Sequence, residues 1–257
     1  MQPSPWLVPT RPNPSAALRL FCFAYAGGGA SAYMPWAKVL PATIEIVSVQ
    51  LPGREGRFHE APLTNLGEVM EGIAHAVGAN LDKPYMLFGH SLGALIAFEL
   101  TRRFAAHARA MPLGLVVSGK RAPHMPSRRR PFSRLPDAEF IREIADYKGT
   151  PASILENAEL MELILPRLRA DATLFDDYQY RDSGPLPCPI VAFGGTEDAH
   201  VSAGELLAWS ELTDTFSYRT FDGDHFFIHS HQNAVTTALS EAIDSAISAG
   251  KPVLRCA

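Results

Sequence analysis

Few cysteines, no long apolar run and no excess of positive charge characterise this sequence of 257 residues. Its 3 cysteines, Cys22, Cys188 and Cys256, are scattered and odd in number, which excludes a disulfide framework and a C-x-x-C metal site. No run of about 18 apolar residues could cross a membrane, and prolines interrupt the N-terminal stretch where a secretory signal would be apolar. We therefore expect a cytoplasmic protein with reduced thiols.

The net charge of -4 also excludes a general nucleic-acid binder, which would carry a basic excess. A chain of this length, 47% hydrophobic and 19% charged, suits one α/β domain over residues 1–257. Residues 1–16 are rich in proline, serine and asparagine, so we expect an extended lead-in outside the core. A monomer is the default expectation.

Short apolar segments alternate along the chain with segments of helical spacing, which predicts an α/β fold. Parallel strands need crossover connections, so this alternation favours a mainly parallel sheet flanked by helices. The predicted strands are 18–25, 44–51, 85–89, 113–118, 190–194 and 216–221.

The pattern changes in the segment of about 122–187, where three helical patterns follow one another without a strand. An all-helical insertion between two strands is typical of a cap over the carboxyl edge of the sheet, where such sheets bind ligands. We interpret this segment as a lid. The alternative is that its helices complete the core.

The stretch GHSLG has the G-x-S-x-G pattern, in which a serine stands on a sharp turn between a strand and a helix. Apolar residues precede Ser91, and an Ala- and Leu-rich amphipathic run follows to about His107. This context favours Ser91 as a nucleophile. The alternative is a helix cap, which needs no chemistry.

A serine nucleophile needs a histidine base, and in this fold the base follows the acid in the chain. His225 stands in a Gly-Asp turn directly after the last predicted strand, and it is our candidate. His229 and His231 are its competitors, whereas His90 adjoins Ser91 and cannot turn back to it. A metal held at the spacing of His225 and His229 lacks a third ligand, so no metal is expected.

The base in turn needs a carboxylate that fixes its tautomer. The predicted strand PIVAFGG leads into Glu197 and Asp198, and we choose Asp198, with Glu197 as the alternative. Asp222 and Asp224 are too close to His225 in sequence to orient it, although one of them is suited to cap the turn.

Acyl transfer also needs backbone donors for the oxyanion. The residue after the nucleophile supplies one, the N–H of Leu92, and a loop after an early strand supplies the other. Gly27, Gly28 and Gly29 permit a close backbone approach in such a loop, and we assign the N–H of Ala26. Neither G-x-G-x-x-G nor a following G-K-[ST] is present, which argues against a phosphate-binding loop.

Several longer stretches carry a family resemblance that covers nearly the whole chain from Leu20 onward. They are FCFAYAGGGASAYMPWA, QLPGREGR, FGHSLGALIAFEL, LPDAEFIREIADYKGTP, LMELILPRLRADATLFDDYQY, GGTEDAHV and GDHFF. With these stretches the chain resembles the type II thioesterases, free-standing α/β-hydrolases that accompany polyketide and nonribosomal peptide synthetases.

The resemblance implies a catalytic triad of Ser91, Asp198 and His225. It also implies hydrolysis of acyl thioesters on the phosphopantetheine arm of acyl or peptidyl carrier proteins, without a metal or an organic cofactor. One departure is Ala199, because proline often follows the acid in this family. The departure leaves the acid assignment intact and loosens the expected loop.

Carrier proteins are generally acidic, and one segment here is strongly basic. Between Lys120 and Arg134 the chain has six basic residues and no Asp or Glu. Arg128, Arg129 and Arg130 are therefore candidates for docking the carrier or its pantetheine phosphate, although a solvated charged face is the alternative. Arg54 and Arg57 could also approach the arm, or could be structural.

Three other functions share this set of residues. They are a general carboxylesterase for small esters, release of medium-chain fatty acids from a fatty acid synthase, and a catalytically silent partner-binding protein. The intact nucleophile, acid, base and glycine loop argue against the silent protein.

Overall fold

Seven strands form one sheet, in the order β1-β3-β2-β4-β5-β6-β7, in the computed structural model. The structure describes residues 1–250, and Cys256 lies outside them. All neighbouring strands are parallel except β1, which runs antiparallel to β3. The strands are β1 (Leu7–Arg11), β2 (Leu18–Phe23), β3 (Ile44–Val49), β4 (Tyr85–His90), β5 (Leu115–Ser118), β6 (Ile190–Gly195) and β7 (Phe216–Phe221).

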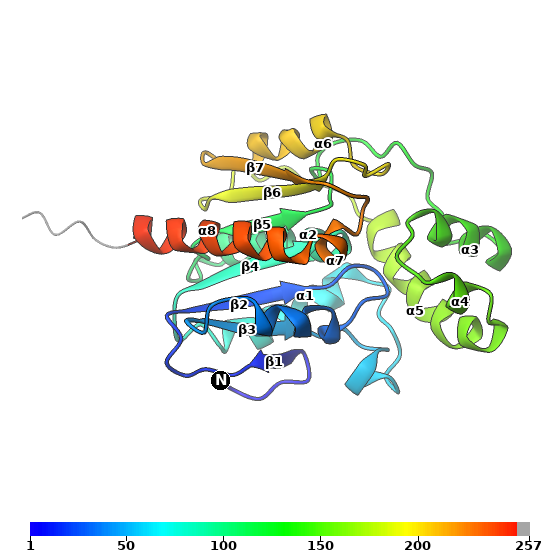
Figure 1. The fold of residues 1–257 in the computed structure, drawn as a ribbon, viewed down its shortest axis with the longest axis horizontal. Coiled ribbons are helices and arrows are strands. Elements are labelled where there is room, and N and C mark those ends of the chain that lie inside the picture. Colours follow the sequence, from blue (N-terminus) through cyan, green and yellow to red (C-terminus); the bar gives the residue numbers. More distant parts are fainter. Residues whose placement is uncertain (251–257) are drawn as a thin grey trace, which may run out of the picture.

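Helices cover both faces of this sheet, as the fold class predicted (Figure 1). The α-helices are α1 (Leu66–Gly78), α2 (Leu92–Ala106), α3 (Asp137–Asp146), α4 (Ala152–Leu155), α5 (Ala158–Asp176), α6 (Ala203–Leu207), α7 (Phe227–Ser230) and α8 (Gln232–Gly250). The 3₁₀ helices are η1 (Ala30–Lys38), η2 (Glu55–Arg57) and η3 (Ala208–Leu212). Within residues 1–250 no helix is long and apolar enough to cross a bilayer.

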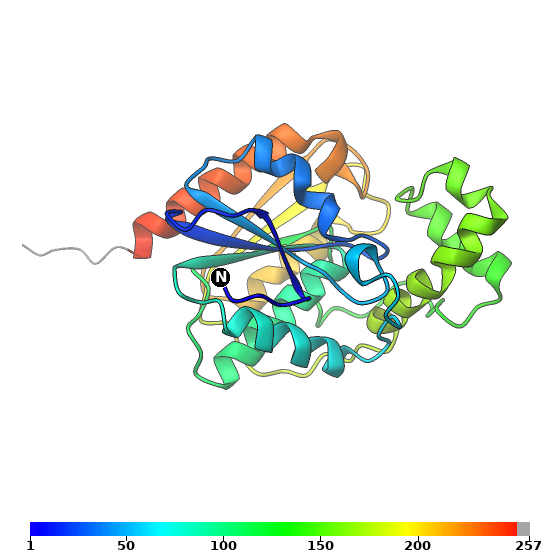
Figure 2. The same cartoon turned by 90° about the horizontal axis from the view of Figure 1, so that it is seen from below.

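The two-residue period of the strands builds two separate cores. In β2, Leu20 and Cys22 pack on one face and Phe21 and Phe23 on the other. The first face is covered by η1 and α8, and the second by α1, α2 and α6, as Figure 2 shows. Both faces are buried because parallel sheets need cover on both sides.

The N-terminal segment differs from its expected place outside the core. Residues 7–11 add strand β1 to the edge of the sheet, and Leu7 is only 5% exposed. Prolines are tolerated there because an edge strand leaves one row of N–H groups without a strand partner. The proline content of residues 1–16 therefore led us to miss β1, because an edge strand can contain proline.

The segment between β5 and β6, residues 119–189, contains helices and loops but none of the seven strands, and we call it the helical insertion. It carries α3, α4 and α5, which lie together beyond the end of the sheet in both views (Figures 1 and 2). Phe132, Phe140 and Leu168 belong to a small core of its own. Two of the three predicted helical patterns fall in the single helix α5, which continues through Pro166.

Close backbone packing fixes the turn between β4 and α2. A Cβ atom at Gly93 would lie 2.0 Å from the carbonyl oxygen of Phe23, and one at Gly89 would lie 2.2 Å from the carbonyl oxygen of Gly93. Such contacts have no room for any side chain. The glycines on both sides of Ser91 thus let α2 begin directly against β2.

Gly93→Ala should therefore destabilise the fold by about 3 kcal/mol or more, because the clash is with backbone that cannot rotate away. Thermal or urea unfolding would measure the change. Gly78→Ala is the matched control, since a Cβ atom at that helical position meets nothing within 4 Å. The control should range from no change to about 1 kcal/mol of added stability. Equal effects of the two substitutions would contradict the packing account.

Candidate active site

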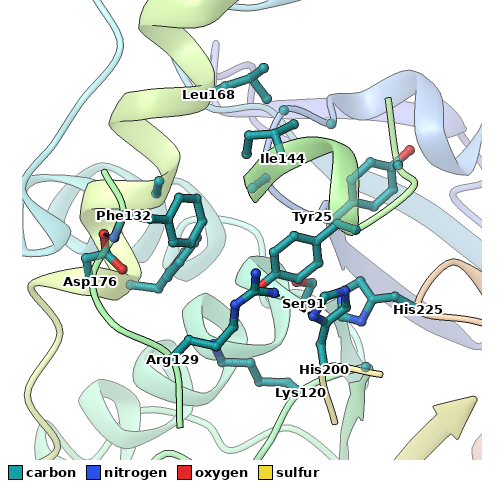
Figure 3. Close-up of a pocket in the computed structure, with 18 of the residues that line it drawn as sticks. Tyr25, Ser91, Lys120, Arg129, Phe132, Ile144, Leu168, Asp176, His200 and His225 are labelled. Atoms are coloured by element: carbon teal, nitrogen blue, oxygen red, sulfur yellow. Dashed lines mark hydrogen bonds between the residues drawn. The ribbon is translucent and has the colours of Figure 1, made fainter. Parts of the chain in front are cut away.

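A cavity of about 710 Å³ lies between the carboxyl edge of the sheet and the helical insertion. Its sheet side contains the glycine loop, Ser91 and His225, and its other walls come mostly from the insertion. Figure 3 shows this arrangement, with Leu168 and Phe132 facing the same space as Ser91 and His225. The position agrees with the general rule that open α/β sheets bind ligands at this edge.

Ser91 stands on the turn that the sequence predicted. Its φ of 54° and ψ of -114° lie in a region that non-glycine residues rarely adopt. The Ser91 N–H donates to the Ser118 carbonyl at 2.8 Å, which holds this strained turn against the end of β5. Ser91 makes no side-chain cap hydrogen bond to α2, so the helix-cap interpretation is wrong.

His225 and Asp198 meet as expected, although they come from different loops. The Nδ1 atom of His225 lies 2.8 Å from Oδ2 of Asp198, and both side chains are buried. The other oxygen, Oδ1, accepts the N–H groups of His200 at 2.8 Å and Val201 at 3.2 Å. Because Nδ1–H donates to Asp198, the Nε2 atom of His225 is left as an acceptor; it is buried and has no partner within residues 1–250.

The competing residues are engaged elsewhere. His229 Nε2 lies 2.9 Å from the Tyr25 hydroxyl, and His231 Nδ1 lies 3.1 Å from the Ser230 hydroxyl. Neither histidine lines the main cavity, and neither does Glu197. Asp224 accepts the N–H of Phe226 at 2.9 Å and so caps the turn after β7.

The two assigned oxyanion donors are also free. Within residues 1–250, the backbone N–H groups of Ala26 and Leu92 donate to no protein acceptor. Leu92 begins α2, where the first N–H groups of a helix have no carbonyl partner inside the helix. Ala26 and Ser91 line the same cavity.

His90 is buried beside this group, where its Nδ1 lies 2.9 Å from the Ser118 hydroxyl. Burial and the nearby His225 hold the pKa of His90 well below its usual range, so this ring is neutral. Its ring centroid is 5.2 Å from that of His225. His90 is therefore a packing neighbour of the candidate base His225.

The sequence analysis missed two residues at this site, His200 and Tyr147, and it gave Arg129 a different role, in carrier docking. His200 stacks on Tyr147 with ring centroids 3.9 Å apart, and its edge faces His225 at 5.6 Å. Arg129 lies 4.9 Å above the Tyr147 ring and contacts His200 Nδ1 at 2.6 Å. His200 follows Asp198 by two residues, so its closeness to the candidate site could have been inferred from the sequence. The contact of Tyr147 with His200 depends on how the helical insertion folds, which the sequence does not show.

The basic segment is largely paired within the protein. Arg128 binds Glu205, and Arg129 lies 2.6 Å from Glu143. Burial alone would raise the pKa of Glu205, but Arg128 and Ser202 outweigh it and lower the pKa to about 2. Arg130 is the least engaged, because it is 68% exposed and 3.8 Å from its carboxylate partner, Glu139.

The walls of the cavity combine apolar and basic groups. Phe132, Ile144, Leu168 and Phe175 give the insertion side an apolar surface. Lys120 lies in the wall with its amine 5.5 Å from the Phe175 ring, and burial lowers its pKa to about 8. Within residues 1–250 no group of three or more His, Cys, Asp and Glu is arranged to hold a metal ion.

Comparison with known proteins adds the family. The sequence model described as "Thioesterase domain" matches residues 18–246. The chain belongs to the thioesterase family. It is 45% identical over 229 residues to the gramicidin S biosynthesis protein GrsT of Aneurinibacillus migulanus, covering 89% of this chain and 90% of that protein.

Two solved structures resemble this thioesterase over nearly its full length. The type II thioesterase BorB from the borrelidin biosynthetic cluster has a TM-score of 0.84 and 35% identity, covering 94% of this chain and 99% of that one. The type II thioesterase YbtT from the yersiniabactin pathway has a TM-score of 0.85 and 31% identity over the same shares. The expected family and α/β-hydrolase fold are confirmed, and this thioesterase is a serine thioester hydrolase.

The contact between His225 and Asp198 makes a direct prediction for this thioesterase. Asp198→Asn keeps the side-chain shape but permits the wrong histidine tautomer, so kcat should fall about 1,000-fold to 10,000-fold. KM should change little, and steady-state hydrolysis of a small thioester measures both.

Glu197→Gln is the control one residue away, because Glu197 does not line the main cavity. Its kcat should equal that of the wild type. A larger loss of kcat in Glu197→Gln than in Asp198→Asn would assign the triad carboxylate to Glu197 instead of Asp198.

Proposed function

We propose that this thioesterase hydrolyses acyl thioesters on the phosphopantetheine arm of acyl or peptidyl carrier proteins. In this role it removes aberrant or stalled acyl groups from a polyketide or nonribosomal peptide synthase. The observation that carries the chemistry is the buried Nε2 of His225, which has no partner in the described chain and lines the cavity that contains Ser91. The family relatives support the substrate class.

In the first half-reaction, Ser91 Oγ attacks the thioester carbonyl carbon while His225 Nε2 takes the hydroxyl proton. Asp198 stabilises the imidazolium that forms. The carbonyl oxygen becomes an oxyanion that accepts the N–H groups of Ala26 and Leu92. The C–S bond then breaks, the thiol of the arm leaves with the proton from His225, and the acyl group remains as an ester on Ser91.

In the second half-reaction, water takes the place of the thiol. His225 removes a proton from the water, which attacks the ester carbonyl and forms a second oxyanion on the same donors. Collapse of this intermediate releases the carboxylic acid and returns the proton to Ser91. The overall change is thioester plus water to acid plus thiol, and protein groups supply every step.

The cavity walls support the lid interpretation of the helical insertion. Apolar side chains of the insertion, among them Phe132 and Leu168, provide a surface for an acyl chain beside Ser91. A wall made by a separate helical unit is suited to exclude bulk water while the acyl-enzyme exists. Action on carrier proteins of a synthase agrees with a cytoplasmic enzyme, and Cys22 and Cys188 are free thiols.

A panel of acyl-carrier thioesters from acetyl to decanoyl tests this function. The wild type should turn over carrier-bound thioesters, and Ser91→Ala should lose at least about 1,000-fold in kcat because the nucleophile is gone. Fastest turnover of short chains supports editing, whereas a medium-chain optimum would assign fatty acid release. Oxygen esters hydrolysed as fast as thioesters, with no turnover of carrier substrates, would make the enzyme a general esterase.

The sequence analysis also named Arg128, Arg129 and Arg130 as candidates for carrier docking. Arg128 and Arg129 are closely paired with carboxylates of this protein, so we propose Arg130 as the docking residue. Arg130→Glu should raise KM for acyl-carrier substrates roughly threefold to tenfold, through lost attraction to an acidic partner. KM for a small thioester should not change. Arg134→Glu is the control, because Arg134 is similarly exposed but binds Asp177 at 2.8 Å and does not line the cavity. Equal changes of KM for both substrates would rule out docking at Arg130.

A further inference from the structure

The helical insertion contacts the glycine loop through a buried carboxylate. Asp171, on α5, is 1% exposed, and its Oδ2 accepts the N–H of Gly27 at 2.7 Å. Gly27 has a φ of +78°, and the side chain of Leu168 lies against it from the same helix. One turn of α5 therefore holds the peptide next to Ala26, whose N–H is the proposed oxyanion donor.

A second, oppositely charged residue joins this contact from another part of the chain. Arg54, in the segment after β3, makes two parallel hydrogen bonds to Asp171, at 2.7 and 2.8 Å. The same guanidinium donates to the Gly28 carbonyl at 3.1 Å. Arg54 and Asp171 thus hold the loop at two successive residues, through one N–H and one carbonyl oxygen.

From this geometry we infer that the Arg54–Asp171 pair is a positioning device for the oxyanion loop. By fixing Gly27 and Gly28, the pair sets the direction of the preceding N–H, that of Ala26. The inference rests on the proposed function, because it assigns a role within the same acyl-transfer step. It also makes the helical insertion part of the catalytic apparatus rather than only a cover.

Charge explains why the device needs both residues. An unpaired carboxylate beside Ala26 would repel the oxyanion that forms in the transition state, and burial strengthens this repulsion. Arg54 cancels that charge in the bidentate geometry that guanidinium and carboxylate groups favour. The other charged groups near the pair are Arg167, one turn earlier on α5, and Glu55, which accepts from the Ser31 hydroxyl at 2.5 Å.

The test compares kcat and KM for a small acyl thioester in variants at the two positions. Arg54→Met should lower kcat roughly 10-fold to 100-fold, because it releases Gly28 and leaves the Asp171 charge beside the oxyanion. Asp171→Asn should cost less, because its amide oxygen still accepts from Gly27. KM should stay within about twofold in both, since the device acts on the transition state.

A double variant separates this role from simple support of the fold. In Arg54→Met, the unpaired Asp171 carboxylate remains near the oxyanion and lowers kcat. Adding Asp171→Asn to Arg54→Met removes that charge and should restore part of the lost kcat, whereas two losses of support for the fold would add. Arg54→Lys keeps the positive charge without the two parallel hydrogen bonds, so its kcat should fall less than that of Arg54→Met, and it provides a second variant if Arg54→Met does not fold.

Arg19→Met is the matched control. Arg19 and Glu45 form another buried ion pair on β2 and β3, at 2.8 Å, and this pair lies at the ends of the strands away from the glycine loop. The variant should lose stability while keeping the wild-type kcat and KM.

Wild-type kcat in Arg54→Met and Asp171→Asn, or equal kcat losses in Arg19→Met, would overturn the inference. A KM change without a kcat change would also overturn it. Absence of thioester turnover in the wild type would instead refute the proposed function, so the two failures are distinguishable.

Discussion

The close approach of α2 to β2 is the constraint on which the site depends. Gly93 faces the Phe23 carbonyl without room for a Cβ atom, and Ser91 is held at a positive φ between β4 and α2. This contact lifts the Ser91 hydroxyl out of the backbone turn and aligns the start of α2 with the loop that follows β2. The strain of the turn is offset by burial on both sides of the sheet, where β4 is entirely buried.

Parallel register then gathers the remaining groups. The strands β2, β4, β6 and β7 all run in one direction, so the segments that follow them meet at one edge. Those segments carry Ala26, Ser91, Asp198 and His225. The helical insertion covers this edge and contacts it at several places. Tyr147 stacks on His200 in the loop that carries Asp198, and α5 contacts the glycine loop. The cover and the candidate catalytic groups therefore form one connected unit.

Much of this arrangement was predictable from local patterns. Short apolar segments predicted the six parallel strands to within a few residues, and the glycine spacing predicted the sharp turn at Ser91. Sequence could not give β1, because an edge strand carries little periodic signal, nor the continuity of α5 through Pro166. Ion pairs between distant residues could not be predicted either. Arg128 has no acidic neighbour in the sequence, but it binds Glu205, which is 77 residues away. The sequence shows which residues are charged, but which of them form ion pairs depends on the fold.

Covalent capture on a carrier protein tests the central claim most directly. A carrier whose pantetheine thiol bears a fluorophosphonate in place of the acyl thioester would be mixed with the enzyme, and the adduct mapped by peptide mass spectrometry. The account predicts one crosslink per enzyme, on Ser91, formed faster than with the same fluorophosphonate on free pantetheine. A crosslink on another residue, or no crosslink while the enzyme hydrolyses acyl-carrier thioesters, would contradict it.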